Sequence, residues 1–151
     1  MVAAALLLGQ TPGAQSLPDA DTREIRSYTL TEAALARYMA ATRKLSGIQL
    51  SCADDEPGVD SLAAAAAKID AVPGAKVAVE SAGMTSREYV VFAFALIENA
   101  MAAYALDQSG GTLPPGISME NVEFFRKHAG EMEKLASETE DAGCAEDTGD
   151  S

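Results

Sequence analysis

Apolar residues recur along this chain with the three- to four-residue spacing of α-helices, and no useful stretch alternates with the period of two expected of a strand. The longest apolar segment is Arg87–Gln108, and Thr85 and Glu88 at its start have the S/T-x-x-E spacing of a capping box. We therefore predict that a long helix begins there, ends before Ser109-Gly110-Gly111 and forms the centre of the fold.

The same signals predict three further main helices and one short helix. They are expected at residues 29–46, opened by a capping box of Thr29 and Glu32; at 61–72, capped by Asp60 or Ser61; at 76–82, the short helix; and at 118–137, capped by Ser118. Segment 17–28 is polar without a sustained period, and we interpret it as a linker. The predicted fold is an all-α, antiparallel bundle of four main helices plus one short helix over residues 29–137, followed by a disordered acidic tail, 138–151.

The predicted long helix has two different faces. The half expected to face the core collects Tyr89, Phe92, Ala93, Leu96, Ile97, Ala100 and Tyr104. The other half carries small residues such as Ala95 and Ala102, with Glu98 among them and Asn99 at its border. No cation lies one helical turn from Glu98, so its carboxylate must reach solvent, a ligand or a cation of another helix. The candidate cations are Arg37, Arg43, Lys68 and Arg126.

Composition limits both the core and the partners. Hydrophobic residues make up 48% of the chain, but alanine is the commonest of them, Trp is absent and there are four Phe and four Tyr, so we expect a thin core. The formal net charge of -12 disfavours binding to nucleic acid and to anionic membrane surfaces. Glu98 and Asn99 also argue against a membrane span.

The N-terminal segment 1–16 is signal-like. It is uncharged and apolar from Val2 to Leu8, as in the hydrophobic region of a secretory signal, and Ala14-Gln15-Ser16 offers small residues for cleavage. No Lys or Arg follows Met1, so a frayed apolar N-terminus is the alternative. The segment predicts export to the periplasm or to the outside of the cell.

Side chains with candidate chemistry are few. Cys52 and Cys144 have no metal-binding spacing; in an exported chain they are candidates for a disulfide, with two unpaired thiols as the alternative. His128 has Glu131 three residues later, a spacing that could hold one metal ion, but we favour a solvated histidine of the last helix. The acidic stretch Asp54–Asp60 lacks the pattern of a calcium loop. We expect no metal, no cofactor and no catalytic residue.

The C-terminal half carries a resemblance. The stretches AGMTSREYVVFAFALIENAMAAYAL and LPPGISMENVEFFRKHAGEMEKL, within Ala82–Leu135, combine a capped long helix, a Pro-Gly linker and a final helix. In this layout the chain resembles a group of small exported helical proteins of environmental bacteria that have no assigned activity. The resemblance implies a shared helical fold and export, and it supplies no functional residues.

Three hypotheses for function follow. The first is a non-enzymatic interaction or self-association module that meets a protein partner or a second copy through the face around Ala95, Glu98 and Ala102. The second is a helical bundle that binds a small apolar ligand in an apolar pocket. Its candidate polar contacts are Glu98, Asn99, Tyr38 and Tyr104. The third is an enzyme that uses Glu98 as general acid or base.

Overall fold

A computed structural model describes residues 16–48 and 60–140 of the chain. The described residues form six helices and no strand, which confirms the predicted all-α class. The helices are α1 (Asp19–Ser27), α2 (Glu32–Ser46), α3 (Leu62–Ala71), α4 (Ala75–Ser81), α5 (Ser86–Asp107) and α6 (Met119–Glu140). The antiparallel arrangement of four main helices stays a prediction, and the structure adds α1 to the expected elements.

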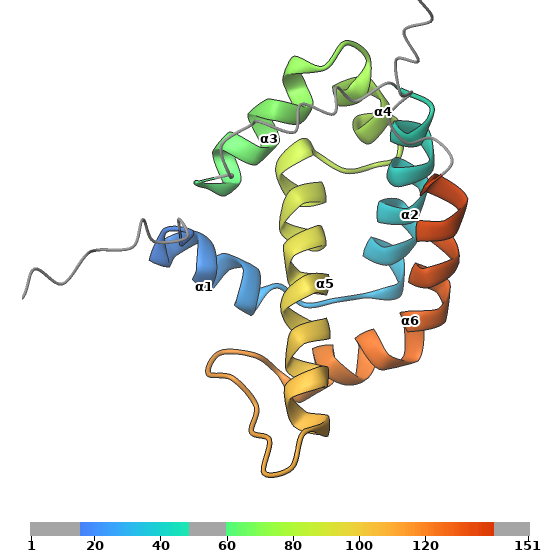
Figure 1. The fold of residues 1–151 in the computed structure, drawn as a ribbon. Helices are drawn as coiled ribbons and strands as arrows, with labels where there is room; N and C mark the ends of the chain where they lie inside the picture. Colours follow the sequence, from blue (N-terminus) through green and yellow to red (C-terminus); the bar gives the residue numbers. More distant parts are fainter. Residues whose placement is uncertain (1–15, 49–59, 141–151) are drawn as a thin grey trace, which may run out of the picture.

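Helix α5 lies at the centre of the fold. In Figure 1 it runs through the middle of the molecule, with α1 on one side and α2 on the other, and it contacts all the remaining helices described. Helices α3 and α4 lie near its N-terminal end, whereas the start of α6 crosses its C-terminal half. Helix α6 then continues beside α2, so the two halves of α5 have different neighbours.

Helix α1 occupies the segment that we predicted to be a linker, and that prediction was wrong. Its charges suit a helix, because Asp19 and Asp21 lie in the first turn and Arg26 in the last, where each complements the helix dipole. Ile25 is its only buried residue, so no apolar stripe announced it in the sequence. The helix depends on its tertiary contacts, since nine residues are too few for a stable isolated helix.

Most predicted helix starts are confirmed by side-chain caps. Thr85 accepts a hydrogen bond from the amide of Glu88 at 3.1 Å. Ser61 accepts one from the amide of Ala64 at 3.1 Å, and Ser118 accepts one from the amide of Asn121 at 3.2 Å. Each of these hydroxyls satisfies one amide that has no partner within its helix.

The predicted start at Thr29 is wrong, because α2 is capped two residues later by Thr31. The cause is Asn121, a buried residue of α6 that holds the backbone before α2 in an extended form. Its Oδ1 accepts from the amide of Leu30 at 3.0 Å, and its Nδ2 donates to the carbonyl of Tyr28 at 2.7 Å. These two hydrogen bonds fix the backbone on both sides of Thr29 from the far end of the chain, so the helix begins only after Thr31.

Buried residues fall into two clusters. The larger surrounds the N-terminal half of α5 and includes Phe92, whose ring contacts Tyr28 edge-on at a centroid distance of 5.9 Å. The smaller, at the C-terminal half, joins Ala102 and Ala103 to Ile117 and Val122. Small residues line much of both clusters, in agreement with the thin core predicted from composition.

Candidate functional site

The small-residue face of α5, predicted to be an interaction surface, lies inside the fold. Ala95 and Ala102 are 0% exposed, so neither can meet a partner while the helices around α5 stay in place. Arg87 and Glu98 lie on the same stripe of α5, about 16 Å apart along its axis at 1.5 Å per residue. Helix α1 binds both of them and so covers the stripe between. The prediction that Ala95 and Ala102 form an interaction surface was therefore wrong, because other parts of the same chain already cover both residues.

The cation that pairs with Glu98 is Arg26 of α1, at 3.2 Å between Nε and Oε2, with both side chains partly exposed. Arg26 was not among the four candidates, because the segment that carries it was interpreted as a linker. Three of those candidates pair elsewhere, Arg37 with Glu88, Arg43 with Glu138 and Arg126 with Asp107. A cation of another helix was one of the three predicted outcomes for Glu98, beside solvent and a ligand, and its source was not predicted.

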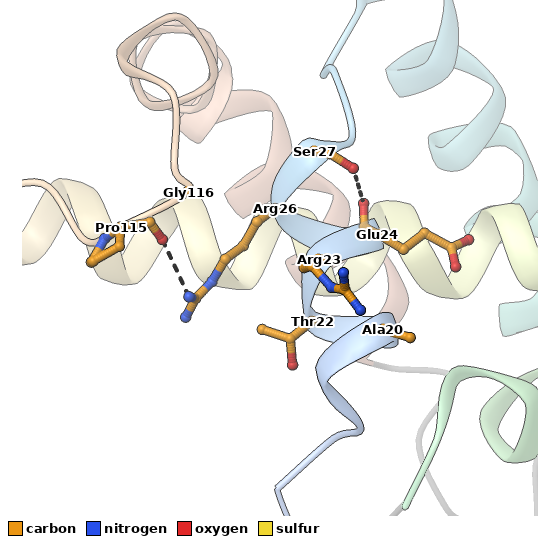
Figure 2. A pocket seen from close by; sticks show the side chains of 8 residues that line it. All are labelled: Ala20, Thr22, Arg23, Glu24, Arg26, Ser27, Pro115 and Gly116. Carbon is orange, nitrogen blue, oxygen red and sulfur yellow. Dashed lines mark hydrogen bonds between the residues drawn. The ribbon is translucent and has the colours of Figure 1, made fainter.

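Arg26 also forms the wall of a hollow between α1 and the loop before α6 (Figure 2). Its Nη1 donates to the carbonyl of Pro115 at 3.2 Å, and Gly116 leaves room for the arginine, since a Cβ there would lie 3.2 Å from Arg26 Cδ. The hollow has a volume of about 820 Å³ and opens to solvent. It is lined by Ala20, Thr22, Arg23, Glu24, Arg26, Ser27, Pro115 and Gly116. Because Arg26 is bound both to Glu98 and to the carbonyl of Pro115, its guanidinium is already engaged within the fold.

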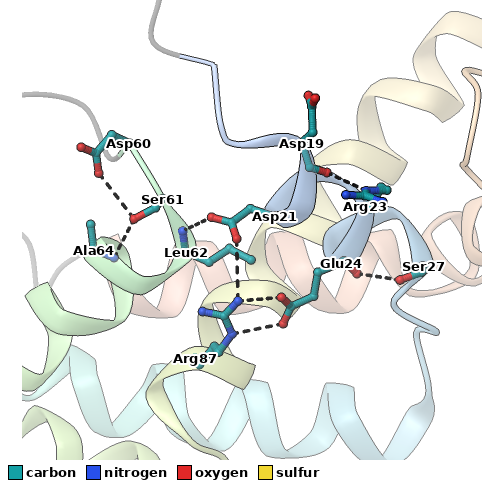
Figure 3. Close-up of polar contacts among 10 residues, drawn as sticks. All are labelled: Asp19, Asp21, Arg23, Glu24, Ser27, Asp60, Ser61, Leu62, Ala64 and Arg87. Atoms are coloured by element: carbon teal, nitrogen blue, oxygen red, sulfur yellow. Dashed lines mark hydrogen bonds and ion pairs between the residues drawn. The ribbon is translucent and has the colours of Figure 1, made fainter.

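The other end of α1 is fastened by Arg87 (Figure 3). Its Nε and Nη2 donate to the two carboxylate oxygens of Glu24 at 3.2 and 2.6 Å, the paired geometry that a guanidinium and a carboxylate favour. Asp21 lies 3.7 Å from the same guanidinium and also accepts from the amide of Leu62 at 2.8 Å. Helix α1 is thus tied to the start of α5 and to the start of α3.

Asn99 is 2% exposed and makes one side-chain hydrogen bond, from Nδ2 to the carbonyl of Ala95 at 2.7 Å. Its Oδ1 is buried without a partner. A buried amide oxygen left without a hydrogen bond costs about 1–3 kcal/mol, so Asn99 is a local defect in the packing of α5.

Large apolar side chains are exposed on the C-terminal half of α5. Ile97, Met101 and Tyr104 are 55%, 66% and 70% exposed, and their spacing places them on one face. We call these three residues the α5 apolar strip. Ile97 and Tyr104 were predicted to face the core, and this prediction was wrong. Helix α5 is apolar around much of its circumference, so its sequence did not determine which side its neighbours cover.

The four polar residues predicted to line an apolar pocket do not converge. Tyr38 packs against the larger core cluster, where its ring stacks on that of Tyr89 at a centroid distance of 4.9 Å. Tyr104 is exposed to solvent. Burial, with a smaller contribution from Tyr89, raises the pKa of the Tyr38 hydroxyl well above its ordinary value. Glu98 is bound to Arg26, and Asn99 is buried. The predicted ligand contacts are therefore spread over separate parts of the fold.

His128 was predicted to be solvated, but it is 4% exposed. Its Nδ1 lies 2.8 Å from a carboxylate oxygen of Glu131, and its Nε2 lies 3.0 Å from one of Glu32 on α2. Only a doubly protonated imidazole can donate both hydrogen bonds. Lys127 also binds Glu32, at 2.7 Å. The hydrogen bond from Lys127, and to a smaller extent the one from His128, lowers the pKa of Glu32 below its ordinary value. His128 thus links α6 to α2.

Among the described residues, no group of three or more His, Cys, Asp or Glu is arranged to hold a metal ion. Cys52 and Cys144 lie outside the described residues, as do segment 1–15 and residues 141–151 of the acidic tail. The proposed disulfide, the signal-like segment and the disorder of residues 141–151 stay predictions. The predicted start of the tail at residue 138 was wrong, because α6 continues to Glu140 and Glu138 pairs with Arg43.

Within the same residues, α5 alone has the length and composition of a membrane span, with a mean hydropathy of 1.6. The core helix of a soluble protein can have the same properties, and 44% of the apolar stretch is buried against the other helices. This helix is therefore weak evidence for a membrane protein.

The fold and the surfaces described define an all-α protein whose central helix is enclosed by other helices over its N-terminal half and left partly open over its C-terminal half. Comparison of the chain with protein-family models, curated proteins and solved structures finds no match. The resemblance to small exported helical proteins of environmental bacteria stays a prediction.

Proposed function

We propose that the protein is a non-enzymatic self-association module in which the α5 apolar strip of one copy packs against the same strip of a second copy. The observation that supports this proposal is the exposure of Ile97, Met101 and Tyr104 along one face of the central helix. Adjacent large apolar side chains rimmed by polar residues mark protein interaction sites more often than scattered ones do.

A second copy fits the strip by geometry. In an antiparallel pair related by a two-fold axis at Met101, the two Met101 side chains meet and each Ile97 lies opposite Tyr104 of the other copy. Every large side chain of the strip then gains an apolar neighbour. Methionine at the centre suits such a contact, because its flexible thioether adapts to the opposing surface.

Charge around the strip is compatible with self-pairing. The two acidic residues at its edges are each neutralised by an arginine, Glu98 by Arg26 and Asp107 by Arg126 at 2.6 Å. Two copies that meet here bring no unpaired like charges together, even though the net charge of each chain is -12.

The size of the strip sets the strength of the contact. Three side chains of this size bury on the order of 300–400 Å² per copy, well below the roughly 800 Å² per partner of a stable interface. We therefore expect a weak, reversible dimer that forms at high protein concentration.

Sedimentation velocity over a range of concentrations tests the proposal. We expect the mass of the wild-type protein to rise toward that of a dimer and that of Met101→Lys to stay monomeric. Val77→Lys is the matched control, because Val77 is 68% exposed but lies on α4, and it should dimerise like the wild type. A protein that is monomeric at every concentration would overturn the proposal, and so would loss of dimer in both variants. Binding of the monomer to lipid vesicles that Met101→Lys abolishes would point to a membrane surface instead.

The other two hypotheses have less support. The candidate ligand contacts are dispersed, and the carboxylate of Glu98 is already bound to a guanidinium. We keep export to the periplasm or beyond as part of the proposal, on the apolar segment Val2–Leu8 and the small residues that follow it. Cell fractionation with mass measurement of the N-terminus tests it, since export should remove residues 1–16.

A further inference from the structure

Helix α1 is fastened to the rest of the fold mainly by charge. Its only buried residue is Ile25, supported by the partly buried Leu17 just before the helix. The remaining contacts include three ion pairs, Arg26 with Glu98 and Arg87 with both Glu24 and Asp21. Because only one side chain of this nine-residue helix is buried, the loss of several ion pairs shifts the balance between docked and released α1.

These ion pairs are accessible to salt. Both arginines are partly exposed, with 34% and 43% of their side-chain surface open to solvent. Charges in such positions are screened by dissolved ions, and the Debye length falls from about 30 Å in 0.01 M salt to about 3 Å in 1 M salt. The ion pairs of α1 therefore weaken strongly over this range.

The connection between α1 and α2 provides a fixed pivot. Asn121 binds the backbone of Tyr28 and Leu30 from α6, and α2 begins directly afterwards at Thr31. Movement of α1 therefore stops at this point and does not require α2 to leave its place. The surface beneath α1 is the small-residue stripe of α5, including Val91 and Ala95.

We propose that α1 is a strap that high ionic strength releases: it leaves α5 as a unit about Tyr28–Leu30, while α2 to α6 keep their fold, and it uncovers the small-residue face of α5. The strap works independently of the α5 apolar strip. Its release also removes Asp21 from the first amide of α3, so the start of α3 loosens together with α1.

Amide hydrogen exchange of the full chain in about 10 mM and about 1 M sodium chloride tests this proposal. We expect exchange in Asp19–Ser27 to accelerate about three- to tenfold at high salt, as the loss of several exposed ion pairs implies. Exchange in α5 and α6 should stay constant or slow down, because salt also screens the repulsion within a chain of net charge -12.

Two variants separate release of α1 from general destabilisation. Arg87→Gln removes two of the three ion pairs and should make α1 exchange rapidly already at low salt, with little further response to salt. Arg37→Gln is the matched control, because it breaks an equally exposed ion pair with Glu88 that does not involve α1, and it should leave exchange in α1 unchanged. Exchange in α1 that ignores salt, or that rises only together with α5 and α6, would overturn the proposal.

Discussion

The two halves of α5 both carry large apolar side chains, but their environments differ. Up to Leu96 the helix contributes Val90, Val91 and Phe92 to the larger core cluster, where other helices cover it on most sides. From Ile97 onward only the start of α6 and the loop before it add buried apolar contacts, and the α5 apolar strip stays open. The difference teaches that burial along an apolar helix depends on which neighbours reach it, because Ile97, Met101 and Tyr104 are large apolar side chains and still stay exposed.

The largest effect should come from the enclosed half. Phe92→Ala removes a ring that is fully buried between Tyr28 and Tyr38, and we expect a loss of about 3–5 kcal/mol in the free energy of unfolding, measured by urea denaturation. Ile97→Ala, in the open half, should change it by no more than about 0.5 kcal/mol. Equal losses for the two variants would contradict the comparison.

The smaller cluster at the open half should be less sensitive. Val122→Ala removes two buried methyl groups next to Ala102 and Ala103, and we expect a loss of about 2 kcal/mol from the transfer of these groups and the small cavity left. The same urea experiment measures it. A loss as large as that of Phe92→Ala would show that the two clusters form one cooperative core.

Asn99 lies where the two halves of α5 meet. Because its Oδ1 has no partner, replacing this residue should raise the stability of the protein, not lower it. Asn99→Leu keeps the branched shape and the number of heavy atoms and removes the unsatisfied oxygen, so we expect stabilisation by about 1 kcal/mol. Asn121→Leu is the matched control: both ends of that amide are bonded, and its loss should destabilise by about 1–3 kcal/mol. Destabilisation by Asn99→Leu as large as that by Asn121→Leu would contradict the cost assigned to the oxygen of Asn99.

The smallest effect concerns the polar link that holds α6 against α2 beyond the open half. The pKa of Glu32 is lowered in the fold, so its contribution to stability is complete above its ordinary value of 4.5 and disappears as pH falls through the lowered pKa. Glu32→Gln should therefore lower the melting temperature at about pH 6, and the effect should diminish as the pH falls below 4.5 and through the lowered pKa of Glu32. Glu133→Gln, an exposed glutamate of α6, should show no such dependence.

Much of the fold could be predicted from local signals. Thr85, Ser61 and Ser118 cap helices as their spacing indicated, because a cap depends on residues within one turn. Helix α1 could not be predicted in this way, since its stability comes from Arg87 and Glu98, more than sixty residues away along the chain. The wrong helix start at Thr29 also results from a distant contact, because Asn121 accepts a hydrogen bond from the amide of Leu30 and so holds the backbone there.

The candidate site was less predictable than the fold. The neighbours of Glu98 in sequence showed that its carboxylate needs solvent, a ligand or a cation of another helix. Arg26, the cation observed, was outside the predicted helices from which candidates were taken. Met101 carried no signal, because an apolar residue on an apolar helix gives no indication of its direction. Only the positions of α1 and α6 determine that the strip at Met101 is open.

The bonds from Asn121 to Tyr28 and Leu30 span 93 and 91 residues, and they have a consequence for biosynthesis. The N-terminal helices emerge from the ribosome long before the side chain that fixes the turn between them. At about 5–20 residues per second, this delay lasts roughly 5 to 20 seconds. During that interval α4 and α5 are synthesised and can pack on α2, but the backbone of Tyr28 and Leu30 lacks its partner, so the turn between α1 and α2 is fixed only after α6 has emerged.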